Sequence, residues 1–246
     1  MRSNSIDPFA ALPRARYLHA TRPAACLLVL LAASFIPGAA TAHGVANADQ
    51  GFIESNVGLA LVPYLYLGAK HMVTGYDHLL FLAGVIFFLY RLRDVALYVT
   101  LFALGHSVTL LVGVLGGIHA DPFLIDALIG LSVAYKGFEN LGGFKTLGWV
   151  PDTRLAVLVF GLAHGFGLAT KLQDVAIAPE GLVGNMLAFN AGVEMGQFTA
   201  LALILITFNL WRATGRFLQH AAVANWMLML SGFTLIGYQM SGYWLG

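Results

Sequence analysis

Six long apolar runs follow one another along the chain and are separated by short polar or glycine-containing connections. They cover residues 57–90, 94–117, 122–141, 153–171, 181–211 and 221–245. A helix that crosses the hydrocarbon core of a bilayer needs about 20 mainly apolar residues, and every run is about that long or longer. The pattern predicts an all-α integral membrane protein, in which about six transmembrane helices form a single domain over residues 57–246.

The first apolar run is longer than one span and is interrupted at Thr74-Gly75. It predicts a short outer helix followed by a main helix that begins near Asp77. Broken helices are tolerated in lipid only where the freed backbone groups are buried in protein or line a cavity. We therefore expect protein, and not lipid, to surround this break.

Pairs of glycines four residues apart recur in three of the runs. They are Gly113/Gly117, Gly161/Gly165 and Gly192/Gly196. Small residues at this spacing let the backbones of two membrane helices approach closely. The three pairs therefore predict tight helix packing.

A cleavable signal peptide is predicted over residues 1–42. Its basic start, apolar stretch and small-residue end are Arg14, Arg16 and Arg22, residues 24–35, and Ala40-Thr41-Ala42. An uncleaved anchor helix is the alternative, but the apolar stretch is short and ends at Pro37. Cleavage would make His43 the first residue and leave residues 43–56 as a short segment outside the cytoplasm.

Positive charges gather in alternate connections between the runs. They are Arg91, Arg93, Lys145, Arg154, Arg212 and Arg216. The other connections, residues 118–121 and 172–180, carry acids and no lysine or arginine. The positive-inside rule then predicts a multi-pass protein of a bacterial-type inner membrane, with both mature termini extracytoplasmic.

The composition excludes two large classes of protein. Of the 246 residues, 59% are hydrophobic and 10% are charged, whereas a soluble domain has about 45–50% apolar and about 25% charged residues. The formal net charge is +1, and no block of lysine and arginine is present to neutralise phosphates, so nucleic-acid binding is not expected. No nucleotide-binding loop is present either, so ATP is not expected to drive the protein directly.

The single cysteine, Cys26, lies in the predicted signal peptide. The mature chain therefore has no thiol, which excludes disulfides and thiolate-bound metal centres. The remaining ligand types are imidazole and carboxylate, and these suit borderline ions such as nickel, cobalt, zinc and copper(II).

Ionisable side chains are rare inside the apolar runs, and this makes them candidates for function. Such a side chain costs about 2.5 kcal/mol or more at the centre of a bilayer and normally faces the interior of the bundle or a water-filled cavity. The candidate metal-binding residues are His71, Asp77, His78, His106, His164 and Glu194, with His43, Glu139, Asn190 and Gln197 as additional candidates.

His71, Asp77 and His78 form the densest group. In one continuous helix the two histidines would share a face but lie about 10 Å apart, too far for one ion with metal–nitrogen distances of about 2 Å. A break at Gly75 would bring them closer. Asp77 could instead orient an imidazole from behind, and in the structural alternative Asp77 and His78 only cap the start of a helix.

His106 and His164 lie near the middle of their runs. Each alone could be a core histidine that is hydrogen-bonded to a neighbouring helix, but together with Glu194 they favour a site. Asn190, Glu194 and Gln197 are spaced by four and three residues and share one helix face. That face could bind a cation in transit or carry a proton in the opposite direction, or it could form an interhelical hydrogen-bond network.

Two further groups have a structural and a functional interpretation. Lys136 and Glu139 are three residues apart and are expected to form an internal salt bridge, with a cytoplasmic gate as the alternative. His43 would offer an amine and an imidazole after cleavage, a pair that can chelate copper or nickel. It could equally be an accidental terminal residue.

Several motifs, in this order, give the chain a resemblance to a known family. They are His71-x5-Asp77-His78 followed by Leu-Leu-Phe-Leu, Gly105-His106-Ser107, Tyr135 to Leu141 with Glu139-Asn140, Leu162-Ala-His164-Gly-Phe-Gly167, and Phe189-Asn190-x-Gly-Val-Glu194-x-Gly-Gln197. In order and spacing they resemble the HupE/UreJ family, membrane proteins associated with hydrogenase and urease gene clusters. The resemblance implies a nickel or cobalt permease that uses His71, Asp77 and His78 as its metal motif at the outer face and supplies nickel enzymes.

Three functions follow from these residues. The first is a non-enzymatic permease, which predicts polar groups strung from one membrane face to the other. The second is a membrane-embedded metalloenzyme, which predicts a closed cluster of ligands around one ion. The third is an accessory subunit that delivers metal to a maturation system or to another membrane complex, and it predicts an apolar face with small residues left uncovered.

Overall fold

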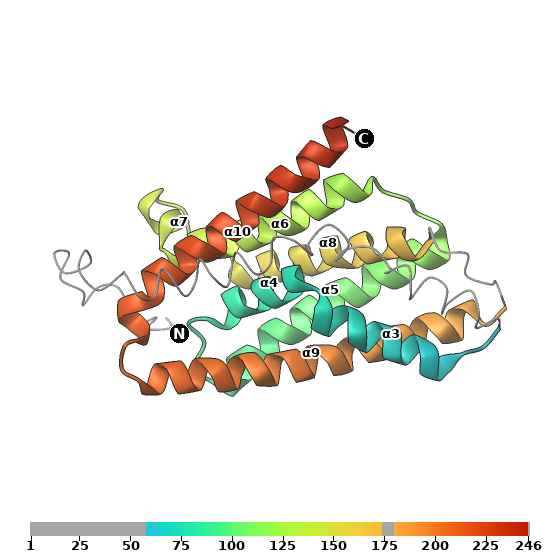
Figure 1. Ribbon diagram of the computed structural model, residues 1–246, viewed down its shortest axis with the longest axis horizontal. Coiled ribbons are helices and arrows are strands. Elements are labelled where there is room, and N and C mark those ends of the chain that lie inside the picture. Colours follow the sequence, from blue (N-terminus) through green and yellow to red (C-terminus); the bar gives the residue numbers. More distant parts are fainter. Residues whose placement is uncertain (1–57, 174–179, 246) are drawn as a thin grey trace.

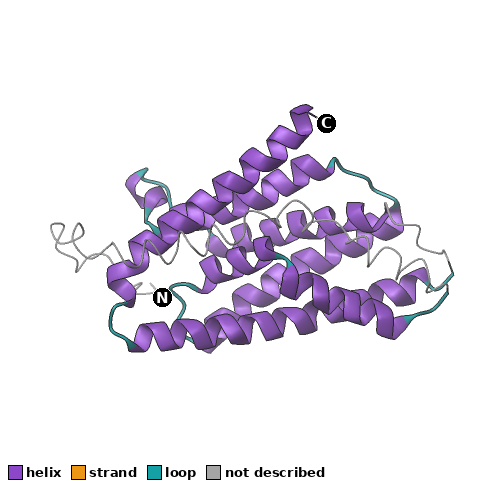
Figure 2. Cartoon of the chain, in the orientation of Figure 1, coloured by secondary structure: helices purple, strands orange, loops and turns teal. Residues whose placement is uncertain are grey.

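The structure is a computed structural model that describes residues 58–173 and 180–245. In this part of the chain, the residues form helices joined by short loops, without strands (Figure 2). The predicted all-α fold is confirmed. The signal peptide predicted over residues 1–42 and the segment 43–56, with His43, lie outside the described residues.

Eight helices, numbered α3 to α10 in Figure 1, make up the described chain. Their bounds are Leu61–Thr74 (α3), Tyr76–Ile86 (α4), Leu92–Gly116 (α5), Pro122–Asn140 (α6), Gly143–Thr146 (α7), Thr153–Gln173 (α8), Leu182–Ala213 (α9) and Phe217–Leu245 (α10). Five of the predicted runs coincide with one helix each to within a few residues. The one-turn helix α7 has no counterpart among the predicted runs.

The break predicted in the first run is present. Helix α3 ends at Thr74, Gly75 is extended with φ −73° and ψ 96°, and α4 begins at Tyr76. The 14 residues of α3 and the 11 residues of α4 are each too few to cross a membrane, which needs about 20. Together they form one broken element that enters the middle of the bundle (Figure 1).

The protein is a multi-pass helical membrane protein. Among the described helices, α5, α8, α9 and α10 are long and apolar enough to cross a membrane. Helix α6 has 19 residues and carries Asp126, Lys136 and Glu139, which lowers its hydropathy. It corresponds, with the α3–α4 pair, to the two remaining predicted spans.

Three long helix pairs build the bundle: α3 packs along α9, α5 along α8 and α6 along α10, while α4 contacts α5, α6 and α9. Glycines explain the first pair. A Cβ on Gly192 would overlap the carbonyl oxygen of Leu65, and one on Gly196 would lie 2.6 Å from the carbonyl oxygen of Ala69. Only glycine leaves room for the two backbones to touch, so the close packing predicted here is confirmed.

Helices α5 and α8 run in the same direction and also touch at glycines. A Cβ on Gly161 would lie 2.5 Å from the carbonyl oxygen of Phe102, and one on Gly165 would overlap the carbonyl oxygen of His106. The second pair is therefore also held by direct contact between backbones, as predicted.

The third glycine pair differs from its prediction. A Cβ on Gly113 would lie 2.6 Å from the side chain of Ala169, so Gly113 does serve helix packing. Gly117 instead ends α5 in the left-handed conformation, with φ 61°, which glycine adopts without strain. One turn before Gly113, the Thr109 hydroxyl donates a 2.7 Å hydrogen bond to the carbonyl of Leu162 and links α5 to α8.

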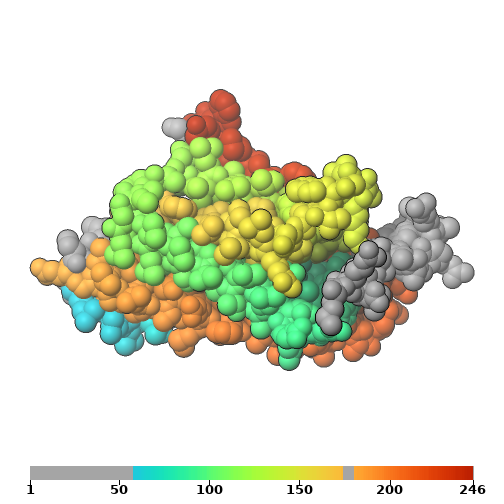
Figure 3. Space-filling view, turned by 180° about the vertical axis from the view of Figure 1, so that it is seen from behind, coloured from blue at the N-terminus to red at the C-terminus, as the bar shows by residue number. Residues whose placement is uncertain are grey.

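The three connections with positive charges lie at the same end of the bundle (Figure 1). They are the α4–α5, α6–α8 and α9–α10 connections, and we call this end the basic end. Figure 3 shows the face formed by α5, α6 and α8, where the segment around α7 projects near the basic end. The charge pattern is thus confirmed, and its assignment to the cytoplasm remains a prediction.

At the basic end, Arg212 of α9 holds the last turn of α4. Its guanidinium donates hydrogen bonds of 2.7 Å to the carbonyl of Phe87 and 3.3 Å to that of Ile86. It also lies 4.3 Å from the centre of the Tyr90 ring, a cation–π distance. Arg212 therefore caps the end of α4, where the Phe87 carbonyl accepts its shorter hydrogen bond and the Ile86 carbonyl also accepts one from the Leu89 N–H at 3.0 Å.

We expect Gly192→Ala to destabilise the protein, because its Cβ would push α9 away from the backbone of α3. Overpacking of this kind costs about 1–3 kcal/mol, or about 5 °C in Tm for a protein of this size. The measurement is thermal unfolding of the purified protein in detergent. Gly237→Ala is the matched control, since a Cβ there meets nothing within 4 Å; equal Tm values for both variants would contradict the packing role of Gly192.

Candidate metal centre

The break at Gly75 brings the first group of candidate residues together. His71 lies in the last turn of α3, and Asp77 and His78 lie in the first turn of α4. The Gly75 N–H still donates a 2.9 Å hydrogen bond to the His71 carbonyl, but the chain then changes direction. The ring centroids of His71 and His78 are 5.1 Å apart, instead of about 10 Å in a continuous helix, so the expectation that the break brings them closer is confirmed.

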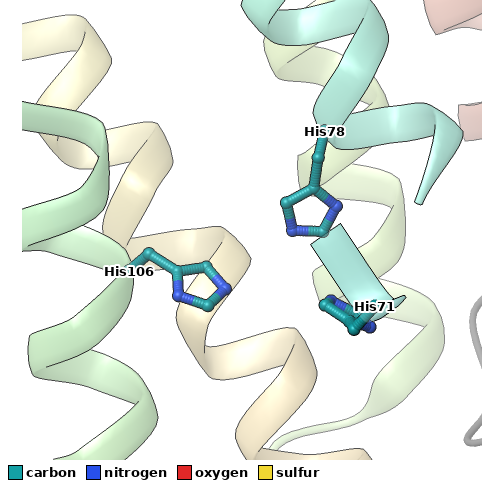
Figure 4. Close-up of side chains that lie close together, drawn as sticks. All are labelled: His71, His78 and His106. Atoms are coloured by element: carbon teal, nitrogen blue, oxygen red, sulfur yellow. The ribbon is translucent and has the colours of Figure 1, made fainter. Parts of the chain in front are cut away.

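His106 from α5 and His164 from α8 meet the same imidazole. The ring of His78 lies 5.8 Å from that of His106 and 4.9 Å from that of His164, measured between centroids. Figure 4 shows His71, His78 and His106 on three separate helices with their rings turned toward a common space. We call His71, Asp77, His78, His106 and His164 the histidine cluster.

The histidine cluster contains two overlapping groups of possible metal ligands. His71, His78 and His106 each offer one donor atom within 4.8 Å of the others, and so do Asp77, His78 and His164. Donors around a tetrahedral ion lie about 3.3 Å apart for metal–nitrogen distances of about 2 Å. A contraction of about 1.5 Å or less would therefore complete either group around one ion.

Hydrogen bonds orient two of the imidazoles. Nδ1 of His78 lies 2.9 Å from Oδ1 of Asp77, and Nδ1 of His164 lies 2.7 Å from the carbonyl oxygen of Phe160. A carboxylate and a carbonyl only accept hydrogen bonds, so in both rings Nδ1 carries a hydrogen, and Nε2 is the atom through which a neutral ring would bind a metal. This is the arrangement by which histidine ligands are oriented from behind in metal sites.

His106 gives the clearest indication of a ligand. It is 1% exposed, and neither ring nitrogen has a hydrogen-bond partner within the described part of the chain. The same holds for Nε2 of His78, which is 3% exposed. Leaving a buried polar atom unsatisfied costs about 1–3 kcal/mol, a cost that a coordinated cation would remove.

The depth of the metal motif differs from the expectation of an outer-face site followed by a deeper histidine pair. His78 contacts both His106 and His164, which lie near the middle of α5 and α8. The physical reason is that α3 occupies the half of the broken span away from the basic end, so Asp77 and His78 begin only where α4 starts inside the bundle. The outer site and the deeper histidine pair, which were expected to be separate, therefore form one cluster.

Glu194 is not part of the histidine cluster. It is exposed and lines a cavity of about 490 Å³ between α5 and α9, together with Ser107 and Gln197. Gln197 is buried and donates a 3.2 Å hydrogen bond to the Val99 carbonyl, while Asn190 is half-buried one turn away. Glu194 and Gln197 therefore face α5, whereas Asn190 does not line this cavity and its Oδ1 is buried without a hydrogen-bond partner in the described part of the chain. A metal role for these three residues remains a prediction.

Glu139 also lies away from the histidine cluster, toward the basic end. Its Oε2 is 2.6 Å from Nζ of Lys136, and its Oε1 accepts a hydrogen bond from Thr153. The expected internal salt bridge is confirmed. Nearby, the Asn140 amide donates to the Gly84 carbonyl at 2.9 Å, which links α6 to α4.

Sequence reasoning missed an aromatic layer next to the histidine cluster. It consists of three buried side chains, one each on α4, α5 and α8: Phe81, Phe102 and Phe160. Each lies three or four residues from the histidine of its own helix, toward the basic end. Ring centroids are 5.3 Å apart for Phe81 and Phe102, and 5.8 Å for Phe81 and Phe160. Their spacing from the histidines is visible in the sequence, but apolar residues in an apolar run give no reason to single them out.

It also missed a buried ion pair between Asp126 of α6 and Lys171 of α8, whose atoms approach to 2.7 Å. Asp126 satisfies the rule that selected the other candidates, because it is an ionisable residue inside an apolar run. That rule could have found it. Its partner lies 45 residues away and could not be assigned from local pattern.

A comparison with known protein families shows where the chain belongs. A family model described as HupE / UreJ protein matches residues 47–246. The chain belongs to the HupE/UreJ family. The match covers all the described helices of this HupE/UreJ protein and confirms the resemblance found in its motifs. Comparison with curated proteins and with solved structures gave no match.

We expect Gly75→Ala to weaken metal binding by this HupE/UreJ protein about tenfold. A Cβ there would lie 2.9 Å from Nδ1 of His78 and 3.0 Å from the His71 carbonyl oxygen, and it would displace the imidazole from its orientation. The measurement is a titration of purified protein with Co²⁺, followed by visible absorption. Gly237→Ala is again the control, and an unchanged affinity in Gly75→Ala would show that this close approach does not position His78.

Proposed function

We propose that this HupE/UreJ protein is a permease for a divalent transition-metal ion, nickel or cobalt, which crosses the membrane by way of the histidine cluster. The observation that carries the proposal is the position of His78. Its ring lies among those of His71, His106 and His164, at centroid distances of 5.1, 5.8 and 4.9 Å. Apolar packing alone gives no reason for four imidazoles to meet in the middle of a membrane bundle.

The donor set supports the choice of ion. Imidazole nitrogens and one carboxylate suit borderline divalent ions, and no cysteine is present in residues 57–246 to favour copper(I). Zinc and copper(II) fit the same donors. The association of the HupE/UreJ family with hydrogenases and ureases favours nickel or cobalt, with a metalloenzyme maturation system as the receiver.

Polar groups on both sides of the histidine cluster support a pathway. Toward the end opposite the basic end lies the Asp126–Lys171 pair, and toward the basic end lies Glu139 with Lys136. The aromatic layer separates the cluster from the basic end. In a permease, this layer has to open before a bound ion can leave toward Glu139.

A membrane-embedded metalloenzyme is the second candidate. The observation that favours it is that the ligands form one closed cluster and not a string of separate stations. In such an enzyme, the ion would activate a water molecule in place. If vesicles that contain the wild-type protein bind about one ion per chain but do not accumulate metal inside, this candidate is supported over a permease.

An accessory subunit is favoured by a different surface. The cavity between α5 and α9 presents small side chains, among them Ala96, Ala103 and Ser107, along two helices that expose many large apolar residues. Small residues on a membrane helix favour contact with another helix. Co-purification of a second membrane protein in a fixed ratio would support an accessory role.

We expect His78→Ala and His106→Ala each to reduce nickel uptake at least tenfold at low external metal. Loss of His78 breaks both ligand groups. Loss of His106 breaks the group that contains His71, so that only Asp77, His78 and His164 remain to hold the ion. The measurement is the initial rate of radioactive nickel uptake by vesicles that contain the purified protein.

His119→Ala is the matched control, since this histidine is exposed in the α5–α6 connection. It should leave uptake unchanged. Wild-type uptake in His78→Ala, at equal protein content, would reject the histidine cluster as the path of the ion.

A further inference from the structure

The Asp126–Lys171 pair is buried to a degree that surface ion pairs do not reach. Both carboxylate oxygens of Asp126 accept hydrogen bonds from Nζ of Lys171, at 2.8 and 2.7 Å, and the Gln239 amide donates to Oδ2 at 3.3 Å. The side chains are 5% and 13% exposed. Three helices, α6, α8 and α10, therefore meet at one carboxylate.

This ion pair lies directly beyond His164 on the side away from the basic end. His164, Gly167 and Lys171 are spaced by three and four residues, so they share one face of α8. A Cβ on Gly167 would lie 3.6 Å from Oδ1 of Asp126, which places the carboxylate one turn beyond His164. Lys171 comes one turn later and only two residues before α8 ends at Gln173.

Tyr76 links the ion pair to the histidine cluster. It is the first residue of α4, next to Asp77, and its hydroxyl lies within electrostatic range of both Asp77 and Asp126. The Tyr76 hydroxyl is thus influenced by both carboxylates, whereas Phe81, Phe102 and Phe160 lie on the opposite side of the histidine cluster.

A buried ion pair of this kind is weak evidence for a stabilising role. Removing two charges from water costs about as much as their attraction returns, and apolar replacements of buried pairs are often neutral or stabilising. Ionisable groups retained inside membrane bundles usually lie on ion or proton pathways. A carboxylate that already holds one cation offers a site where another cation can exchange with it.

We propose that Asp126 is an outer receiving site for the permeant divalent cation, and that Lys171 is a tethered counter-ion which the arriving cation displaces. The proposal rests on the permease function. The Lys171 ammonium can leave because its flexible stem lies in the last turn of α8, from which such side chains reach the aqueous interface. The pair therefore closes this side of the histidine cluster until a cation of higher charge replaces the ammonium at Asp126.

The experiment measures nickel uptake by vesicles as a function of external nickel concentration. Asp126→Asn removes the receiving carboxylate and should raise KM about tenfold, with a smaller change in the maximal rate. Lys171→Gln removes the competing ammonium and should lower KM about threefold or more. Lys145→Gln, which removes one positive charge from an exposed side chain at the basic end, should leave KM unchanged.

The double variant Asp126→Asn/Lys171→Gln separates this role from a structural one. It keeps the volume of both side chains and contains no unpaired charge, so its Tm should be close to that of the wild type, and its KM should match that of Asp126→Asn. A purely structural pair would lower the Tm of both single variants and restore the wild-type KM in the double variant. That result, or a KM shift in the same direction for both single variants, would overturn the proposal.

A third variant distinguishes failure of the proposal from failure of the permease function. His78→Ala should abolish uptake whatever the role of Asp126. If His78→Ala transports normally, the permease function through the histidine cluster is wrong. If His78→Ala is inactive while Asp126→Asn and Lys171→Gln keep the wild-type KM, only the receiving site is wrong.

Discussion

Helices α5 and α8 touch backbone to backbone at Gly161 and Gly165, and the position of the histidine cluster depends on this contact. The carbonyl of His106 lies against Gly165, and His164 is the residue before it, so one seam sets the separation of two imidazoles. In lipid, helices gain little from burying apolar surface against each other, and close packing takes over that role. Glycine contacts, which contain no chemistry, therefore determine the geometry of the chemical site.

The contact of α3 with α9 completes the same construction. Gly192 and Gly196 fix α3 along its length, so that its last turn, with His71, ends beside α5. At Gly75 the chain leaves α3 in an extended conformation and starts α4 with Asp77 and His78. Helix α4 then lies between the α3–α9 and α5–α8 contacts. Asp77 and His78 therefore enter the bundle from a direction that a straight helix could not provide.

Much of this architecture is encoded locally and could be predicted. The length of the apolar runs gives the helices, Thr74-Gly75 gives the break, and the cost of charge in lipid selects His106 and His164. Depth and partners are not local properties. The sequence pattern predicts the metal motif at the outer face. The structure places it deeper, because the position of α3 in the bundle depends on its packing against α9, which the pattern of one run does not contain.

Glu194 and Asp126 show what the rule for intramembrane charges leaves open. Such groups are expected to face the bundle interior or a cavity, and α9 turns Glu194 toward the cavity beside α5, where it is exposed. Asp126 does face the interior, and its partner lies on a helix that only the fold brings near. A rule about cost identifies which residues need an explanation, whereas the helix pairing decides what each of them meets.

Helix α4 carries a candidate metal ligand and a residue of the aromatic layer on the same short helix. His78 and Phe81 are three residues apart on its 11 residues, with the extended Gly75 at one end and the Arg212 hydrogen bonds at the other. A tilt of α4 about the end held by Arg212 moves both side chains at once. A movement of α4 as a whole would therefore change the aromatic layer and the position of the His78 ring together.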